Sequence, residues 1–136
     1  METRINNVIR IKASFGGNFF RYWFEFLKPF HSLTEREIDV ISELVKRRYE
    51  LSKVISDPDV LDNEVLSTQT RVLIKEKCKL SDAHFQVIFS KLKREGFIID
   101  GKINKRFIPR IDPDDSQFKM LLLFDIEKIN DQQQGD

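Results

Sequence analysis

The sequence predicts an α+β fold that is mainly helical. Apolar residues recur at helical spacing in residues 38–45 and again in residues 85–92, a period typical of helices that bury one face. Asp100-Gly101 lies between apolar flanks and indicates a two-residue β-hairpin turn. The chain has 136 residues, of which 40% are hydrophobic, so one domain can bury a core without disulfides.

Residues 1–32 are predicted to form a strand and an aromatic helix. Ile9, Ile11 and Ala13 alternate with polar residues, which is the period of a half-buried strand. Seven aromatic residues then fall within residues 18–30. This density favours a buried helix, which Pro29 should end. No apolar run approaches the roughly 18–20 residues of a membrane span, and no secretory signal is visible. We therefore expect a cytoplasmic protein without a membrane partner.

Residues 33–111 are predicted to contain three main helices and the hairpin. Thr34 and Glu37 have the spacing of a capping box, which predicts a helix over residues 35–53. The polar connector over residues 54–66 contains Pro58 as a break and has room for one short helix. Ser67 then caps a further helix. We expect its inward side chains to be Val72, Leu73 and Cys78.

A capped helix and a hairpin follow. Ser81 is the expected cap of helix 82–95, and Gly96 supplies a left-handed stop. The hairpin should span residues 97–108, with Pro109 ending its second strand. The inward stripe of the helix is predicted to consist of Phe85, Ile88, Phe89 and Leu92.

Residues 112–136 are predicted to be an acidic linker, an apolar strand and a disordered tail. The stretch "QFKMLLLFDIEKI" is the strand candidate, and it could pair with the N-terminal strand. These two apolar segments could also form a homodimer interface or dock a protein partner.

The order helix, helix, turn, helix, β-hairpin is that of a winged helix-turn-helix domain. Residues 33–110 resemble the MarR-like members of this family. Three features carry the resemblance: the cap Leu80-Ser81, the "KLKREGFI" end of the helix, and the hairpin that follows it. The connector over residues 54–66 is longer than that pattern. The Lys/Ile/Asn/Phe-rich style, without an attached effector domain, also looks like small uncharacterised proteins of bacteriophages that infect gut Bacteroides-type bacteria.

The winged-helix resemblance implies that helix 82–95 enters the major groove of DNA. Its outward side chains can read bases, because Gln pairs with adenine, Arg with guanine, and a valine methyl meets a thymine methyl. These candidates are Gln86, Val87, Ser90 and Arg94. The candidates for phosphate contacts are Lys91 on the helix and Lys102, Lys105 and Arg106 on the wing. An ordinary solvated helix surface is the alternative interpretation of these residues.

The charge distribution favours a polyanion partner more than the net charge of +1 does. Residues 91–110 contain seven basic and two acidic residues, a net charge of +5. Residues 111–136 contain two basic and seven acidic residues, a net charge of −5. A basic block beside an acidic tail is typical of a nucleic-acid face.

Catalysis finds little support in the sequence. The two histidines and the single Cys78 have no metal-ligand spacing, and no glycine loop could cradle a phosphate. We therefore expect no enzyme activity, metal or cofactor. The predicted function is binding of double-stranded DNA, most commonly as a transcription regulator. The alternative is a winged-helix protein–protein docking module, such as a phage assembly, packaging or virion-associated component.

Overall fold

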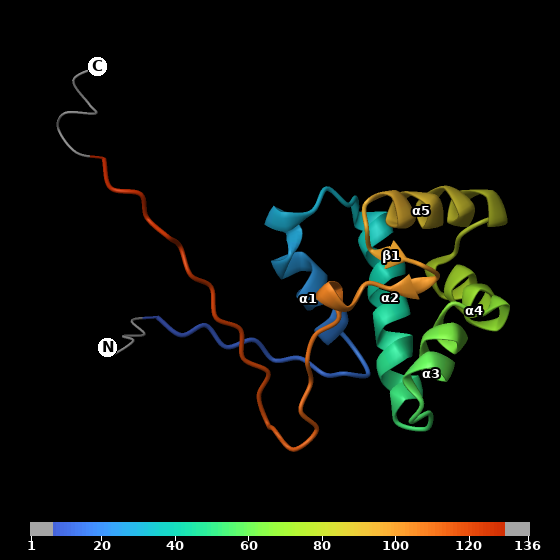
Figure 1. Ribbon diagram of the computed structural model, residues 1–136, viewed down its shortest axis with the longest axis horizontal. Helices are drawn as coiled ribbons and strands as arrows, with labels where there is room; N and C mark the ends of the chain where they lie inside the picture. The colour runs from blue at the N-terminus through green and yellow to red at the C-terminus, as the bar shows by residue number, and fades with distance from the viewer. Residues whose placement is uncertain (1–6, 130–136) are drawn as a thin grey trace.

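A computed structural model describes residues 7–129 of the chain (Figure 1). Five α-helices and one two-stranded antiparallel sheet lie within these residues, which confirms the predicted α+β class. No helix in this part of the chain is long and apolar enough to cross a membrane. The elements are α1 (Phe19–Phe26), η1 (Lys28–Phe30), α2 (Glu35–Ser52), α3 (Pro58–Val65), α4 (Thr68–Cys78), α5 (Asp82–Arg94), β1 (Ile98–Ile99), β2 (Lys102–Ile103) and η2 (Lys105–Phe107).

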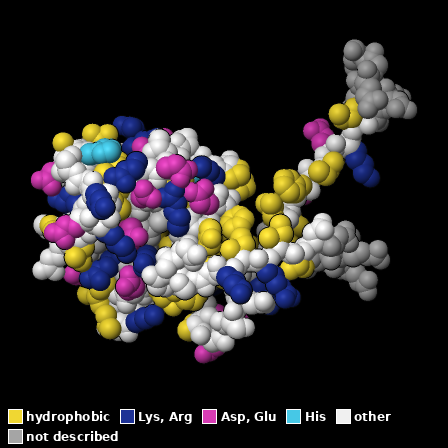
Figure 2. Space-filling model, turned by 180° about the vertical axis from the view of Figure 1, so that it is seen from behind, with side chains coloured by type: hydrophobic (Ala, Val, Ile, Leu, Met, Phe, Trp, Pro, Cys, Tyr) yellow, Lys and Arg dark blue, Asp and Glu magenta, His cyan; other side chains and the backbone are white. Residues whose placement is uncertain are grey.

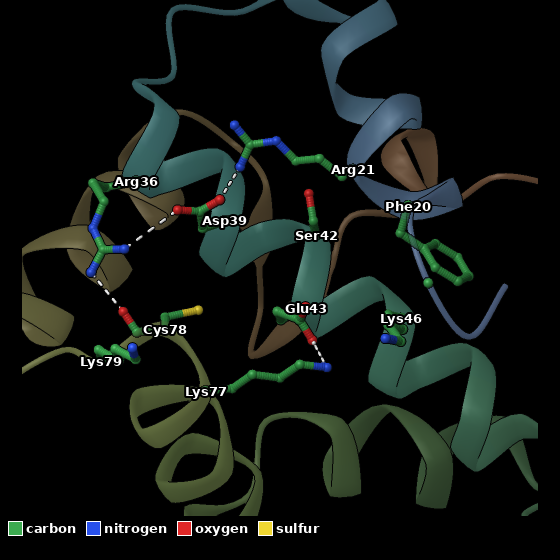
Figure 3. A pocket seen from close by; sticks show the side chains of 11 residues that line it. Phe20, Arg21, Arg36, Asp39, Ser42, Glu43, Lys46, Lys77, Cys78 and Lys79 are labelled. Atoms are coloured by element: carbon green, nitrogen blue, oxygen red, sulfur yellow. Dashed lines mark hydrogen bonds and ion pairs between the residues drawn. The ribbon is translucent and has the colours of Figure 1, made fainter. Parts of the chain in front are cut away.

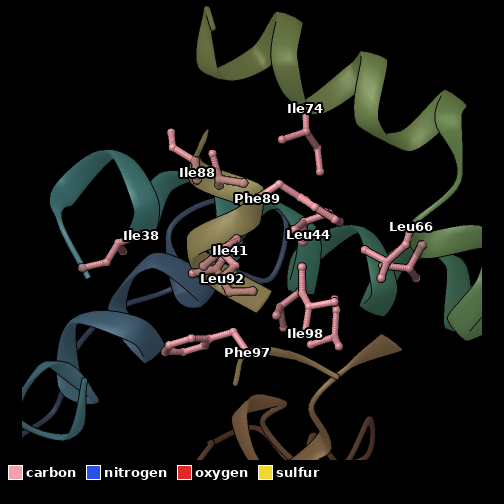
Figure 4. Packing of buried hydrophobic residues seen from close by; sticks show 14 of the residues in the cluster. Ile38, Ile41, Leu44, Leu66, Ile74, Ile88, Phe89, Leu92, Phe97 and Ile98 are labelled. Carbon is pink, nitrogen blue, oxygen red and sulfur yellow. The ribbon is translucent and has the colours of Figure 1, made fainter. Parts of the chain in front are cut away.

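Helix α2 is the centre of the fold and packs against α1, α3, α4 and α5. The predicted capping box at its start is confirmed. The Glu37 backbone N–H donates to Thr34 Oγ1, and the Thr34 backbone N–H donates to Glu37 Oε1 at 2.8 Å. Helix α2 contributes fully buried residues such as Ile38, Ile41 and Leu44 to the core shown in Figure 4. A helix with this much buried surface is stabilised mainly by its neighbours.

Helix α1 covers one side of α2 through part of its aromatic run. Phe20 and Phe24 are buried, whereas Phe26 is half-exposed. The helix ends at Phe26, and Pro29 lies within the short 3₁₀ turn η1. The indole Nε1–H of Trp23 donates to the Phe107 carbonyl at 2.8 Å, and this bond ties η2 to α1.

The connector after α2 is more regular than the sequence predicts. Pro58 begins α3 at its first position, with Asp57 as the N-cap. This agrees with proline's fixed φ and the missing N–H, which the first helical turn does not need.

The predicted inward face of α4 is wrong in two of its three residues. Ser67 caps α4 as predicted, and Cys78 is buried, but Val72 and Leu73 are half-exposed. The buried side chains are Thr70, Ile74 and Cys78, which follow each other at intervals of four residues. The Thr70 hydroxyl is accommodated because it donates to the Glu64 carbonyl at 3.0 Å. A polar residue can therefore occupy the inward stripe.

Helix α5 and the hairpin follow most of the sequence predictions. Phe85, Ile88, Phe89 and Leu92 are buried. Gly96 has a φ of +82°, the left-handed conformation expected after a helix. In the hairpin, Ile98 pairs with Ile103. Asp100 and Gly101 both have positive φ, as a type I′ turn requires.

The second strand is shorter than predicted. It ends at Ile103 rather than at Pro109, because the Asn104 side chain accepts the Arg106 backbone N–H at 3.1 Å and begins η2. The predicted wing over residues 97–108 is therefore a four-residue ladder followed by a 3₁₀ turn.

The two predicted terminal strands are not formed in the single chain. Residues 7–14 (the N-terminal arm) and residues 117–129 (the C-terminal arm) join no sheet, and nearly all of their side chains are exposed. A segment with an alternating pattern forms a strand only when a neighbouring strand satisfies its backbone N–H and C=O groups. Neither arm has such a neighbouring strand within residues 7–129. Both arms leave the globular part on the α1 side (Figure 1). The predicted disordered tail, residues 130–136, lies outside the described residues.

Candidate nucleic-acid interface

Helices α4 and α5 are joined by a tight turn over residues 79–81. Lys79 ends α4 in the left-handed conformation, with a φ of +55°. The Leu80 backbone N–H donates to the Lys75 carbonyl at 2.9 Å, and Ser81 Oγ accepts the His84 N–H at 3.1 Å. These bonds satisfy backbone groups at both helix ends. The turn is therefore well defined, and so is the direction of α5.

The predicted base-reading residues lie together on the outward face of α5. Gln86, Val87, Ser90 and Arg94 are all exposed. Within residues 7–129, none of their side chains makes a hydrogen bond or an ion pair with the protein. An α-helix with its side chains is about 10–12 Å across, which fits the DNA major groove, about 12 Å wide.

Lys91 has a different environment from the other candidates. Its Nζ donates to Glu37 Oε1 at 2.8 Å and lies 3.4 Å from the Ser32 carbonyl. The lysine therefore ties α5 to the start of α2. Burial alone would raise the pKa of Glu37, but hydrogen bonds from Lys91 and Thr34 and the charge of Lys91 lower it overall.

Two of the three predicted wing residues lie beyond the hairpin. Lys105 and Arg106 are exposed in η2. The Asn104 side-chain amide donates to the Gly96 carbonyl at 2.8 Å, so the start of η2 lies against the C-terminal end of α5. This contact brings Lys105 and Arg106 to the same end of the helix as Arg94.

Lys102 lies apart from this cluster. Its Nζ is 3.8 Å from an Asp59 carboxylate oxygen in the first turn of α3, and β2 packs against α3. Both side chains are well exposed, so the pair contributes little to stability. The hairpin tip nevertheless faces α3. We therefore use the name basic cluster for Arg94, Lys105 and Arg106, without Lys102.

Acidic side chains are interleaved with the basic ones over the globular part. On the face that Figure 2 shows, Lys and Arg are interspersed with Asp and Glu over the globular part, and hydrophobic side chains gather most densely along the C-terminal arm. At the start of α5, Asp82 accepts a hydrogen bond from Lys75 at 2.8 Å. This contact with Lys75 lowers the pKa of Asp82. The bond also links α4 to α5 across the turn.

A groove of about 580 Å³, lined mostly by charged residues, lies between α1, α2 and α4 (Figure 3). Its charged side chains pair mainly with each other: Arg21 and Arg36 with Asp39, and Lys77 with Glu43 at 2.9 Å. The sequence offered no signal for this groove, because its partners come from three helices.

Cys78 lies at one edge of this groove. Burial, and then the nearby Glu43 and Asp39 carboxylates, raise the pKa of its thiol to about 11. The thiolate is therefore disfavoured at neutral pH. This chemistry suits a structural cysteine rather than a nucleophile. Within residues 7–129, no three His, Cys, Asp or Glu side chains gather as a metal site.

Comparison with known proteins adds no relative to this description. No model of a protein family matches the chain, and neither a curated protein nor a solved structure matches it.

Proposed function

We propose that this protein binds double-stranded DNA as a compact winged helix-turn-helix module, with α5 in the major groove. The observation that carries the proposal is the outward row of α5, where Gln86, Ser90 and Arg94 point into solvent from a helix fixed on its other face. Side chains of these types can make bidentate or single hydrogen bonds to base edges. A transcription regulator is the most common use of such a module.

The basic cluster supplies the expected backbone contacts. Arg94, Lys105 and Arg106 lie at one end of α5, so they can grip phosphates while the row upstream contacts bases. Phosphate contacts fix the position of a protein on DNA and make binding depend on salt. Lys102 contributes less to this arrangement, because its hairpin faces α3.

Fluorescence anisotropy with a labelled random duplex tests the proposal. Three phosphate contacts predict that affinity falls about a hundredfold between about 50 and 300 mM salt. Arg94→Glu and the double variant Lys105→Glu/Arg106→Glu should weaken binding and flatten this slope. Lys53→Glu is the matched control, since it reverses one exposed charge just beyond the far end of α2. A folded protein that does not bind at the lowest salt, or equal losses in the control, would contradict the proposal.

A second candidate function is protein–protein docking. It is favoured by the exposed apolar side chains of Val87 on α5 and Val72 and Leu73 on α4, together with the mixed charges of the surface. Winged-helix modules serve both purposes, so the fold does not decide between them. In this case Val87→Asp should abolish capture of the partner, while Lys105→Glu/Arg106→Glu should leave it unchanged.

A further inference from the structure

The two arms carry an unusual share of the exposed apolar surface. Within residues 7–129, ten of the nineteen exposed large hydrophobic side chains belong to them. Three lie in the N-terminal arm, and seven lie in the C-terminal arm: Met120, Leu121, Leu122, Leu123, Phe124, Ile126 and Ile129. Contiguous apolar surface of this kind marks an interaction site rather than an ordinary protein surface.

Both arms begin at one aromatic cluster on α1. The Phe15 ring lies 4.9 Å from the Phe19 ring, and the Phe118 ring lies 5.0 Å from Phe19 on the C-terminal side. Phe118 also meets Trp23 at 5.7 Å. Phe19 therefore anchors the roots of both arms. The extended parts leave the body from neighbouring positions and in the same general direction (Figures 1 and 2).

The arms are complementary in charge and in pattern. The N-terminal arm carries Arg10 and Lys12 without an acidic residue within residues 7–14. In the C-terminal arm, Phe124 and Ile126 alternate with Asp125 and Glu127, and Lys119 and Lys128 lie on either side of this stretch. One antiparallel register matches the central residues of both arms, because it pairs Arg10 with Glu127, Lys12 with Asp125 and Ile11 with Ile126, although it also places Ile9 opposite Lys128. Opposite charges and apolar residues at facing positions stabilise paired strands.

A single chain does not use this complementarity. No backbone hydrogen bond joins the arms within residues 7–129, although their roots share Phe19. Pairing within one chain would also give an isolated two-stranded ribbon, which is marginally stable in water, and its apolar face would stay exposed. A second copy removes both difficulties when each N-terminal arm pairs with the C-terminal arm of the other copy, because the two resulting ribbons can then pack their apolar faces against each other.

We propose that the arms form a reciprocal homodimer interface in which strands are exchanged between two copies of this chain. The two pairings are related by a twofold axis, as in most closed dimers, and the two ribbons bury their apolar sides against each other. The arms comprise 21 residues of each copy, 7–14 and 117–129. Stable interfaces use roughly 20–30 residues from each partner. This proposal does not depend on DNA binding.

Sedimentation velocity of the full chain over a range of concentrations measures the assembly. The wild type should reach about twice the 16.1 kDa of one chain. Arg10→Glu/Lys12→Glu and Asp125→Lys/Glu127→Lys should each raise the dimer Kd about tenfold or more, because like charges then face each other at every ionic pair.

Mixing the two charge-reversed variants separates exchange between copies from pairing within one chain. In a mixed dimer each reversed arm meets an arm of opposite charge, so the heterodimer should recover the wild-type Kd. Pairing within one chain would leave both variants defective after mixing. Circular dichroism checks that both remain folded, which we expect because the arms lie outside the core.

Ile126→Asp tests the apolar part of the interface against a matched control. It should make the protein monomeric, whereas Val54→Asp, an equally exposed position after α2, should leave the dimer intact. A monomeric wild type, a dimer insensitive to every arm variant, or a mixture without recovery would each overturn the proposal.

Discussion

The ion pair between Lys91 and Glu37 allows a sharp test of how α5 is held on α2. Lys91 Nζ and the Thr34 backbone N–H both donate to Glu37 Oε1 at 2.8 Å. The Glu37 side chain is only 11% exposed and that of Lys91 23%. Replacing Lys91 with methionine keeps an unbranched side chain of similar length and removes the ammonium. A buried carboxylate is then left with one backbone donor.

The structure sets the size of the expected loss. Removing one partner of a fully buried pair costs about 3–5 kcal/mol, whereas exposed pairs contribute about 0–1 kcal/mol. This pair lies between these limits, because water reaches part of Lys91 and Thr34 keeps its bond to Glu37. We expect Lys91→Met to lower the free energy of unfolding by about 2 kcal/mol. For a chain of this size the melting temperature should fall by about 6–10 °C.

Urea unfolding of Lys91→Met, Glu37→Gln and the double variant measures this interaction. The double variant should lose clearly less than the sum of the single losses, because the second substitution removes the group that the first leaves unpaired. Lys93→Met is the control on the same helix: its ammonium is exposed and only approaches the Phe89 ring at 5.1 Å, so it should cost less than about 1 kcal/mol. A loss below about 0.5 kcal/mol for Lys91→Met, or additive losses, would refute the reasoning.

Three further measurements follow from local features. Folding lowers the pKa of Glu37 from its ordinary value of 4.5. This shift stabilises the fold at pH values above 4.5, and the stabilisation is lost as the pH falls through the folded-state pKa. The urea midpoint of unfolding should therefore fall less steeply on acidification in Glu37→Gln than in the wild type. The Cys78 thiol, with a pKa of about 11, should react slowly with iodoacetamide at pH 8 until urea unfolds the chain. Gly101→Ala should lower the free energy of unfolding by about 1 kcal/mol. The cause is backbone strain at a φ of +71°, since a Cβ at this position would meet no atom within 4 Å. Gly16→Ala is the control and should be neutral, because a Cβ there also meets no atom and its φ is not positive.

Sequence reasoning succeeded where short-range chemistry decides the structure. The capping box of Thr34 and Glu37, the cap at Ser81 and the turn at Asp100-Gly101 each depend on residues a few positions apart. The buried stripe of α5 was also predictable, because its spacing and its aromatic content agree. These features fix the position and the direction of the candidate interface.

It failed where a partner from another element decides the outcome. The inward face of α4 uses Thr70 rather than Val72, because the Glu64 carbonyl can accept the Thr70 hydroxyl. Apolar and polar residues alternate in the arms as they do in strands, but within residues 7–129 no strand of the same chain pairs with either arm. Lys91 stays a predicted phosphate contact, but its pairing with Glu37, which lies 54 positions earlier, could not be predicted from the sequence. Periodicity carries no information about such pairings.

The way α5 is held has a consequence for any binding experiment. Its stability comes from the buried stripe and the Lys91–Glu37 pair, which face the protein, and from the Ser81 cap at its start. Gln86, Ser90 and Arg94 add little to this, and substitutions at such exposed positions usually change stability by less than about 0.5 kcal/mol. A loss of binding in these variants therefore reports on the interface itself. A loss in Lys91→Met must first be corrected for the fraction of protein that remains folded.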